Sequence, residues 1–408
     1  MGLRTGVSRR LLFLAPFPPR LDALHGGSRS VAQLLANLAT RHQIALLYLR
    51  APADLPLDPI LQERCELVEE VVRPNPGISF VEVRARGRSL LRGMPLWVAG
   101  SSVANCDAVI QRIAKTWRPE IVQIEYHVMA QYVSALGDSR APRVLTQHEP
   151  GFGAARESWQ AGRGISRAIR HLDMLAWERY ERTIYGQMDA IVVFTERDRN
   201  TVAPIAVGKP IIRIPLSTTL PERALDPRGR EPASMLLIGN FIHPPNVDAA
   251  IRLVRSIFPQ VQARIPGVVL RIVGDSPPAR LMTLAKGNVV VTGRVPDVTP
   301  YLDQAAVVVV PLRMGGGMRV KVLEALGAGK AVVASRLAAE GLDVVDGEQM
   351  MFAETDEDFS NLSAQLLMDP TKRASLGTSA REWACANLGW SNTIKAYEEL
   401  YDRLVAER

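Results

Sequence analysis

The sequence predicts an α/β protein built from two Rossmann-like, doubly wound domains that face each other across a cleft. Short apolar runs alternate with segments of helical periodicity, which is the pattern of a parallel sheet covered by helices. The whole pattern starts again after a polar segment near the middle of the chain. A length of 408 residues also exceeds what one ordinary hydrophobic core accommodates, so two domains are expected.

The first half of the chain contains six apolar runs that are predicted as strands. In chain order they read RRLLFLAP, QIALLYLR, IVQIEYH, RVLTQHE, AIVVFTERD and PIIRIPLS. Between them, residues 28–40 and the run RAIRHLDMLAWERYERTIYGQ have the apolar spacing of amphipathic helices. Strands that alternate with helices in this way favour a parallel sheet with helical crossover connections.

The second half repeats this organisation after a linker. The segment STTLPERALDPRGREPAS begins at residue 217 and its turn-forming residues make it a predicted linker. After it, the predicted strands read SMLLIG, VVLRIVG, NVVVTG, AAVVVVPL and AVVAS, and VDAAIRLVRSIF is a predicted helix. Both halves begin with a strand, a Pro-Pro loop and a helix, which supports a tandem pair of similar domains.

Composition narrows the classes of function. Hydrophobic residues make up 47% and charged residues 22% of the chain, as in a soluble globular protein, and no apolar run approaches the roughly 20 residues of a membrane span. The net charge of +7 favours an anionic partner: nucleic acid, a phosphorylated small molecule or a lipid surface. Three cysteines without metal-binding spacing indicate a reducing, cytoplasmic location. Six histidines without an HExxH motif or a paired cluster predict no metal site.

One stretch, PLRMGGGMRVKVLEALGAGKAVVAS at residues 311–335, places flexible backbone and charge between two predicted strands. Gly315, Gly316 and Gly317 follow the first strand, at the edge where open α/β sheets bind ligands. Backbone N–H groups at the start of the next helix attract anions. Arg319 and Lys321 would weaken the first helical turn unless an anion lies nearby, so they indicate an anion site.

Glu324 lies one helical turn beyond Lys321 and is suited to bind hydroxyl groups rather than phosphate. A diphosphate beside a pair of sugar hydroxyls, as in a nucleotide-sugar, would satisfy all of these features. The alternative is an ordinary strand-to-helix turn in which Lys321 and Glu324 form a surface pair three residues apart. The residues of this stretch by themselves leave both interpretations open.

Four stretches, taken in their order and spacing, carry a resemblance to a known family. They read LLIGNFIHPPNVDAAIRLV, LRIVGDSP, VTGRVPDVTPYLDQAAVVVVPLRMGGGMRVKVLEALGAGKAVVAS and WSNTIKAYEELYDRL. From Ser234 to the C-terminus, and more loosely over the whole chain, the sequence resembles family 4 retaining glycosyltransferases of the GT-B fold (glycosyl transferases group 1). The resemblance implies an acceptor-side domain over residues 1–216, a nucleotide-sugar donor domain over residues 217–388 and a C-terminal helix over residues 389–408 that crosses back to the first domain.

The resemblance also implies roles for individual residues. The lysine at the position of Lys321 grips the donor diphosphate, the glutamate at that of Glu324 holds the ribose, and the histidine at that of His148 contacts the donor sugar. The expected catalytic residues are therefore His148, Lys321 and Arg319. The expected donor-binding residues are Gly26, Gly27, Gly239, His243, Asn246, Gly293, Arg294, Val295, Gly315, Gly316, Gly317, Met318 and Glu324, with the backbone around 293–295 receiving the nucleobase.

The sequence departs from the family pattern in the donor domain. Many members carry a second glutamate eight residues before the ribose glutamate, and Gly316 stands at that position here. The arginine and lysine that are common in the first loop of this domain are also missing from GNFIHPPN. We expect Arg319, together with His243 and Asn246, to replace the missing charge.

The first half supplies further candidates at predicted strand ends. His148 ends the run RVLTQHE, and His127, Glu125 and Glu149 are the candidates for the acceptor side. For each of them a structural role is the alternative, since a lone histidine or glutamate at a strand end is often part of the core. The Gly-Gly pair of LHGGSRS either meets the donor phosphates, as in the family, or makes a tight strand-to-helix turn.

The stretch VEVRARGRSLLRGMPLWVAG mixes arginines with apolar residues. Arg84, Arg86, Arg88 and Arg92 near Trp97 suit the surface of an anionic membrane, and a solvated basic face is the alternative. Nucleic-acid binding lacks a recognised reader motif, so we expect no nucleic-acid partner.

The function that these observations predict is transfer of a sugar from a nucleoside-diphosphate sugar to an acceptor, with retention and without a metal or other cofactor. The acceptor is a sugar, a lipid-linked molecule or a small molecule, and the location is cytoplasmic, with peripheral contact at the inner face of the plasma membrane as a further expectation. The alternatives are another GT-B activity such as nucleotide-sugar epimerisation, or a catalytically silent subunit that binds a partner, for which Gly316 is the support.

Overall fold

The computed structural model describes residues 7–23, 26–73, 93–160, 164–231, 233–315 and 319–408. The chain divides into two compact units: residues Met1–Pro215 with Thr393–Arg408 form unit 1, and residues Leu216–Asn392 form unit 2.

Unit 1 contains a seven-stranded parallel sheet in the order β3-β2-β1-β4-β5-β6-β7. This is the Rossmann order, with the point of reversal between β1 and β4. The strands are β1 (Arg10–Ala15), β2 (Gln43–Arg50), β3 (Leu67–Val72), β4 (Ile121–Glu125), β5 (Arg143–Gln147), β6 (Ala190–Val193) and β7 (Ile211–Arg213).

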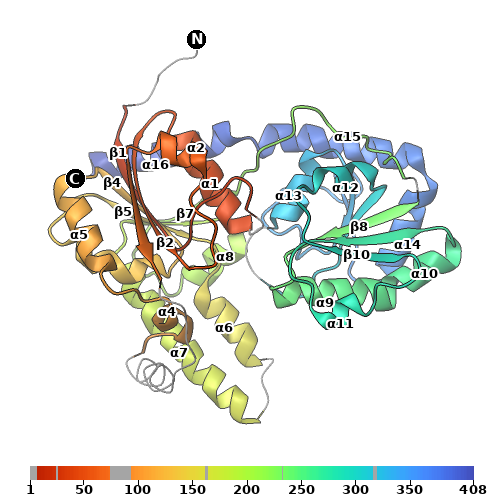
Figure 1. Cartoon of the computed structure of the whole chain (residues 1–408), viewed down its shortest axis with the longest axis horizontal. Coiled ribbons are helices and arrows are strands. Elements are labelled where there is room, and N and C mark those ends of the chain that lie inside the picture. The colour runs from red at the N-terminus through yellow and green to blue at the C-terminus, as the bar shows by residue number, and fades with distance from the viewer. Residues whose placement is uncertain (1–6, 24–25, 74–92, 161–163, 232, 316–318) are drawn as a thin grey trace. The chain divides into compact units, whose positions relative to one another are not determined.

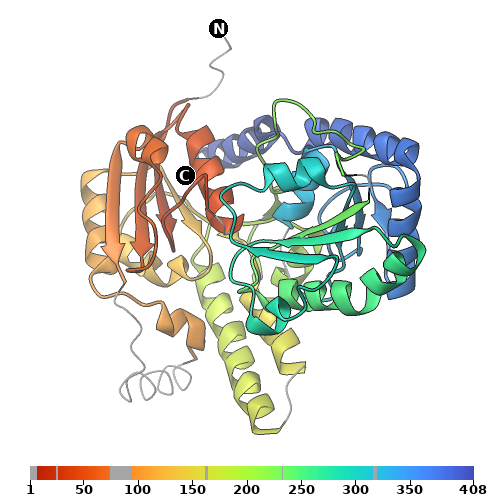
Figure 2. The ribbon, with the colours of Figure 1, turned by 45° about the vertical axis from the view of Figure 1, so that its right-hand side comes forward.

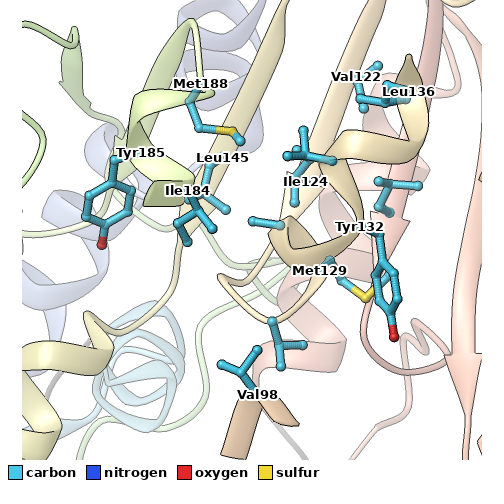
Figure 3. Close-up of a cluster of buried hydrophobic side chains, with 14 of the residues drawn as sticks. Val98, Val122, Ile124, Met129, Tyr132, Leu136, Leu145, Ile184, Tyr185 and Met188 are labelled. Atoms are coloured by element: carbon cyan, nitrogen blue, oxygen red, sulfur yellow. The ribbon is translucent and has the colours of Figure 1, made fainter. Parts of the chain in front are cut away.

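Helices cover both faces of this sheet (Figure 1). They are α1 (Gly26–Leu38), α2 (Pro59–Arg64), α4 (Leu96–Gly100), α5 (Cys106–Thr116), the 3-10 helix η1 (Met129–Leu136), α6 (Gly151–Gln160), α7 (Gly164–Gly186), α8 (Glu196–Val202) and α16 (Trp390–Ala406). Figure 3 shows the core on one face, where Val122 and Ile124 of β4 and Leu145 of β5 pack with side chains of η1 and α7. Because strand side chains alternate, the neighbours Gln123 and Glu125 point to the opposite face.

Unit 2 contains a six-stranded parallel sheet in the order β10-β9-β8-β11-β12-β13, again the Rossmann order when counted within the unit. The strands are β8 (Ser234–Ile238), β9 (Val269–Val273), β10 (Val289–Gly293), β11 (Val307–Val310), β12 (Ala331–Ala334) and β13 (Met351–Phe352). The helices are α9 (Pro244–Arg252), the π-helix η2 (Leu253–Ile257), α10 (Phe258–Arg264), α11 (Ala279–Met282), α12 (Thr299–Gln304), α13 (Val320–Gly327), α14 (Asp356–Met368) and α15 (Pro370–Asn387).

Two edge strands, β3 and β13, are not among the predicted strands. The sequence of β3 is LVEEVV, which interrupts an apolar run with two glutamates, and only the tertiary structure supplies their partners. Glu70 accepts from Tyr48 and pairs with Arg50, while Glu69 pairs with Arg112 at 2.9 Å. A strand of two residues, as β13 is, carries too little pattern to be predicted.

Glycines at the carboxyl ends of β8, β9 and β10 allow the backbone of these strand ends to touch. Gly274 has a φ of 145°, and a Cβ atom there would lie 1.8 Å from the carbonyl oxygen of Gly239. The N–H of Gly274 donates to the carbonyl of Gly293 at 3.2 Å, and the N–H of Gly239 donates to that of Val273 at 3.0 Å. Only glycine combines this φ with so close an approach.

Replacing Gly274 by alanine should therefore destabilise unit 2 strongly. We expect Gly274→Ala to lower the midpoint of thermal unfolding by more than about 5 °C, because strain and steric overlap together cost several kcal/mol. Gly267→Ala is the matched control, since a Cβ atom at Gly267 meets no other atom within 4 Å. Equal midpoints for the two variants in calorimetry would contradict this account of the strand ends.

Candidate functional site

The candidate donor site of unit 2 lies at the reversal point of its sheet, between β8 and β11. The loop after β8 leads into α9, and the loop after β11 leads into α13. Open α/β sheets bind ligands at this place because the two loops diverge and leave a crevice at the strand ends. The residues of the predicted anion site lie on these two loops and at the starts of the two helices.

Lys321 joins the two loops. It occupies the second position of α13, and its ammonium donates a short hydrogen bond to Oδ1 of Asn246 in the first turn of α9. The amide of Asn246 is fixed in turn, because its Nδ2 donates to the carbonyl of Asn240 at 2.7 Å. A lysine predicted from the helix start and an asparagine predicted from the preceding loop are thus brought together.

The loop between β11 and α13 is held in place from the side of α9. Arg252 donates to the carbonyl of Pro311 at 3.1 Å and pairs with Asp356 at 2.6 Å. Arg313 binds Asp248 of α9 through two guanidinium nitrogens at 3.1 and 2.7 Å. These contacts position the charged end of the loop near the start of α9.

Gly315 allows the β11–α13 loop to lie close to the start of α9. It has a φ of 106°, and a Cβ atom there would lie 3.1 Å from Cγ of Pro245 and 3.4 Å from Nη2 of Arg319. Glycine is therefore required by conformation at Gly315, independent of any ligand. Gly316, Gly317 and Met318, which the sequence also predicts as donor-binding, lie outside the described residues.

The environment of Lys321 destabilises its charged form. Many protein atoms surround the ammonium, although part of the side chain remains accessible, and this desolvation together with nearby Arg319 lowers the pKa of Lys321 to about 7. The carboxylate of Glu324 opposes the shift but does not cancel it. A lysine in this state gains a favourable interaction when an anion binds beside it.

The remaining predicted donor residues surround these groups with different exposure. Arg319 is the N-cap residue of α13 rather than part of its first turn, and it is partly buried, as is Glu324. His243 is the exposed N-cap of α9 and makes no side-chain capping bond. Gly293 ends β10 with a φ of 69°, and the next two residues differ: Arg294 is exposed and Val295 is buried.

The candidate site of unit 1 centres on His148, which directly follows β5. Its Nε2 lies 2.7 Å from Oε2 of Glu125, at the end of the neighbouring strand β4. The imidazole stacks on Tyr126 with ring centroids 3.8 Å apart and planes 6° from parallel, and it meets the ring of Phe194 nearly at a right angle. Tyr126 has a φ of 66°, a strained backbone for a bulky residue that places its ring against His148.

Glu125 is predicted as an acceptor-side residue, and the structure puts its carboxylate at 1% exposure, in contact with His148 and Gln123. It can act on a ligand only through His148. His127 is 2% exposed and packs edge-on between Trp97 and Trp177, with ring centroids at 5.0 and 4.7 Å. Burial lowers the pKa of His127 to about 3, so it stays neutral and serves the core.

Glu149 and the glycine pair, Gly26 and Gly27, are at least partly accessible to solvent. Glu149 is exposed immediately after His148. Gly26 and Gly27 open α1 and are partly buried; the next residue, Ser28, donates to the carbonyl of Pro18 at 2.9 Å and ties the start of α1 to the loop after β1. This loop follows β1, which adjoins β4 at the reversal point of the first sheet.

Sequence reasoning missed Glu181, a fully buried carboxylate of α7. Its two oxygens accept from the backbone N–H groups of Gly151 at 2.7 Å and Phe152 at 3.2 Å, at the start of α6, and Gln147 donates to it at 3.0 Å. Burial raises the pKa of Glu181 to about 7 against these hydrogen bonds. Nothing in the helical pattern distinguishes it from Glu178 of the same helix, which pairs with Arg182 on the surface.

A second missed group lies beneath His148. Gln123 and Thr146, from the interior of β4 and β5, and Tyr397 and Tyr401, from α16, form a hydrogen-bonded cluster with Glu125. The sequence IVQIE contains a signal for this cluster, because two polar residues alternate with apolar ones in a buried strand. Among the described residues, no three His, Cys, Asp or Glu side chains come together as a potential metal site.

Comparison with known proteins finds a family match within unit 2. Residues 232–369 match the family model described as Glycosyl transferases group 1. The GDP-mannose-dependent alpha-(1-6)-phosphatidylinositol monomannoside mannosyltransferase of Mycolicibacterium smegmatis is 31% identical over 156 residues, which are 34% of this chain and 40% of that protein. The chain therefore matches less than half the length of this relative.

Solved structures extend the similarity to the fold of the whole chain. Sucrose-phosphate synthase from Thermosynechococcus elongatus is similar over 98% of this chain and 100% of its own, with a TM-score of 0.72 and 18% identity. Anabaena HepE in complex with UDP-glucose is similar over 97% of this chain and 100% of its own, with a TM-score of 0.64 and 14% identity. The prediction of two Rossmann-like domains is confirmed, since the chain shares the fold of these GT-B glycosyltransferase structures, and residues 232–369 match the glycosyl transferases group 1 model.

The lowered pKa of Lys321 predicts that binding of an anion at this site, probed with a nucleoside diphosphate, depends on pH. An anion favours the charged lysine, so above about pH 7 the free protein must take up a proton to bind, and affinity should fall by up to about tenfold per pH unit. Below that pH the lysine is already charged, and its contribution is constant. Titration calorimetry between pH 7.5 and 8.5 measures the effect after the phosphate, with its last pKa of about 6, has fully ionised.

Lys321→Arg is the matched control for this pH dependence, because a guanidinium stays charged over the whole range. Its affinity should be flat where the parent's affinity falls. An equally flat profile for the parent protein would contradict the lowered pKa.

Proposed function

We propose that this protein transfers a sugar from a nucleoside-diphosphate sugar to an acceptor, with retention of the anomeric configuration and without a metal ion, as family 4 glycosyltransferases do. The observation that carries the proposal is the Lys321 ammonium, bound to Asn246 at the reversal point of the sheet in the glycosyl transferases group 1 domain. Its position suits a diphosphate whose negative charge grows as the bond to the sugar breaks.

Preorganised cations at a leaving group stabilise the transition state more than the ground state. Lys321 and Arg319 would supply this charge at the start of α13, where the helix dipole adds to it. Glu324, one turn further along α13, would accept hydrogen bonds from the ribose hydroxyls. A diphosphate neutralised in this way by side chains and a helix start needs no metal ion for its departure.

The donor and acceptor are proposed from the named properties of similar proteins. The mycobacterial relative uses GDP-mannose and acts on phosphatidylinositol monomannoside, whereas HepE binds UDP-glucose. The donor panel for this protein therefore consists of GDP- and UDP-linked hexoses, and lipid-linked and simple sugars form the acceptor panel. His148 of unit 1 would face the donor sugar in this reaction.

Replacing Lys321 should remove both donor binding and turnover. With the donor that the parent uses, we expect Lys321→Ala to lower kcat/KM by about 100-fold or more, the usual cost of one contact to developing charge. Release of nucleoside diphosphate in the presence of acceptor is the measurement. Lys286→Ala is the control. Lys286 is exposed in the loop before β10, at the amino end of that strand, whereas the site lies at the carboxyl ends of β8 and β11.

Glu324→Gln separates the ribose contact from chemistry, since it should weaken binding of plain nucleoside diphosphate as well as of the sugar nucleotide. Turnover of Lys321→Ala equal to that of Lys286→Ala would overturn the proposal. Epimerised donor without transfer, or binding without turnover in the parent, would instead favour the epimerase or the silent partner-binding subunit.

We further propose a cytoplasmic protein that contacts the inner face of an anionic membrane through one surface of unit 1. None of the helices in the described ranges is long and apolar enough to span a bilayer. Figure 2 shows α6 and α7 side by side, extending beyond the sheet of their unit. On α7, Ile169, Leu172 and Leu175 are 49%, 58% and 45% exposed at a spacing of three residues.

Nearby groups give this apolar face a basic and aromatic border. Arg167 and Arg170 are exposed on the same part of α7. Trp97 is 54% exposed on α4, which is attached to α7 by a hydrogen bond from the N–H of Leu96 to Asp173 at 3.0 Å. Apolar side chains bordered by arginines suit the interface of an anionic bilayer. The predicted membrane-facing residues Arg84, Arg86, Arg88 and Arg92 lie outside the described residues, and the proposal does not depend on them.

Co-sedimentation with vesicles tests this surface. We expect phosphatidylserine-containing vesicles to retain the protein at 0.1 M salt and release it at 1 M, because the Debye length falls from about 10 Å to about 3 Å. Leu172→Ser combined with Trp97→Ser should abolish retention, and Val207→Ser, which changes an exposed valine elsewhere in unit 1, should not. If the parent is not retained at low salt, a soluble acceptor becomes the better proposal.

A further inference from the structure

A chain of hydrogen bonds leads from the C-terminal helix to His148 through the interior of unit 1. The hydroxyl of Tyr401 in α16 donates to Oε1 of Gln123 at 3.0 Å, and Nε2 of Gln123 donates to Oε1 of Glu125 at 3.0 Å. Oε2 of Glu125 then meets Nε2 of His148 at 2.7 Å. Every group between the ends of this chain is buried.

The sheet fixes the spacing of this chain. Gln123 and Glu125 are two residues apart on β4, so they project from the same face, and Glu125 lies opposite Thr146 in the register of β4 and β5. Nε2 of Gln123 also donates to Oγ1 of Thr146 at 2.7 Å, and that oxygen lies 3.2 Å from the hydroxyl of Tyr397. The hydroxyl groups of two tyrosines of α16 thus hydrogen-bond side chains of the same two strands, β4 and β5.

Each hydrogen bond in this chain fixes the orientation of the next side chain. Burial raises the pKa of Tyr401 well above its usual range, so its hydroxyl keeps the proton that it donates to Gln123. With Oε1 occupied, the amide of Gln123 must present its NH₂ group toward Glu125. A buried carboxylate needs such donors, because an unmatched charge at 1% exposure is costly.

Three neighbouring side chains contact the imidazole of His148. Glu125 binds Nε2, Tyr126 covers one ring face, and the ring of Phe194 lies 5.0 Å away with the planes at 87°. Because Nε2 is engaged by Glu125, Nδ1 is the ring nitrogen that remains for a ligand.

We propose that Gln123 and Tyr401 are positioning residues for His148: together they orient Glu125 so that it holds the imidazole with Nε2 protonated and Nδ1 directed to substrate. The catalytic relevance of this arrangement rests on the proposed sugar transfer, in which His148 contacts the donor sugar. The arrangement of the imidazole itself does not, and it can be measured without turnover.

The test compares Tyr401→Phe and Thr146→Val with Tyr132→Phe. Tyr401→Phe deletes one hydroxyl of the chain and keeps the ring, while Thr146→Val removes the second acceptor of Gln123. Tyr132→Phe is the matched control, because Tyr132 is also a buried tyrosine of unit 1, 3% exposed, and its hydroxyl bonds Val103 and Ser101 rather than the residues around His148. Thermal midpoints show that each variant is folded before it is compared.

Proton NMR of the histidine rings provides the readout that a purely structural role would not change. The parent should show a downfield Nε2 proton of His148, assigned by its loss in His148→Asn and shifted upfield in Glu125→Gln, where the acceptor is neutral. Its exchange with solvent should be about tenfold faster in Tyr401→Phe and in Thr146→Val than in the parent or in Tyr132→Phe.

Kinetics provides the second readout. We expect kcat to fall about tenfold in Tyr401→Phe, as for outer partners that orient an active group, with unchanged affinity for nucleoside diphosphate in unit 2. If the Nε2 proton is absent in the parent, or if Tyr401→Phe matches Tyr132→Phe in proton exchange, the positioning role is overturned. If the parent transfers no sugar while the NMR effects appear, the proposed function fails and the positioning of His148 stands.

Discussion

The ammonium of Lys321 sets the physical constraint around which unit 2 is arranged. It lies among protein atoms at the start of a helix, beside Arg319, and its hydrogen-bond acceptor is the neutral amide of Asn246. Such a cation is costly without an anion, and the lowered pKa expresses that cost. The close approach of Gly315 to Pro245 and the ion pair between Arg313 and Asp248 keep the two sides of the site close enough for one ammonium to join them.

The buried charge of unit 1, the carboxylate of Glu125, has hydrogen-bond partners within its own unit. The carboxylate of Glu125 is satisfied by Gln123 and His148 within the same unit, and the tyrosines of α16 complete the cluster. One unit therefore presents an ammonium whose charged form is destabilised by burial and which suits an anionic ligand, while the other presents an imidazole that contacts a buried carboxylate.

The differences between prediction and structure follow from contacts that are distant in sequence. Glu125 and His127 are adjacent to the strand end that predicted them, but alternation along β4 and the packing of Trp97 and Trp177 direct them into the interior. Glu181 caps a helix 30 residues earlier in the chain, which no local pattern reports. In each case the sequence indicated a polar residue near a strand end or on a helix, and packing decided whether it meets ligand or core.

The sequence by itself determined the two Rossmann-like halves, the glycine-bearing strand ends and the position of Lys321 at a helix start. These features depend on local periodicity and on backbone conformations that few residue types adopt. Only the tertiary structure decided that Asn246 is the partner of Lys321, that Glu125 serves His148, and that Tyr401 reaches Gln123 across 278 positions of the chain. Such partners are chosen by the register of the sheet and by the docking of α16, because burial makes each polar group require whichever donor or acceptor the fold brings within reach.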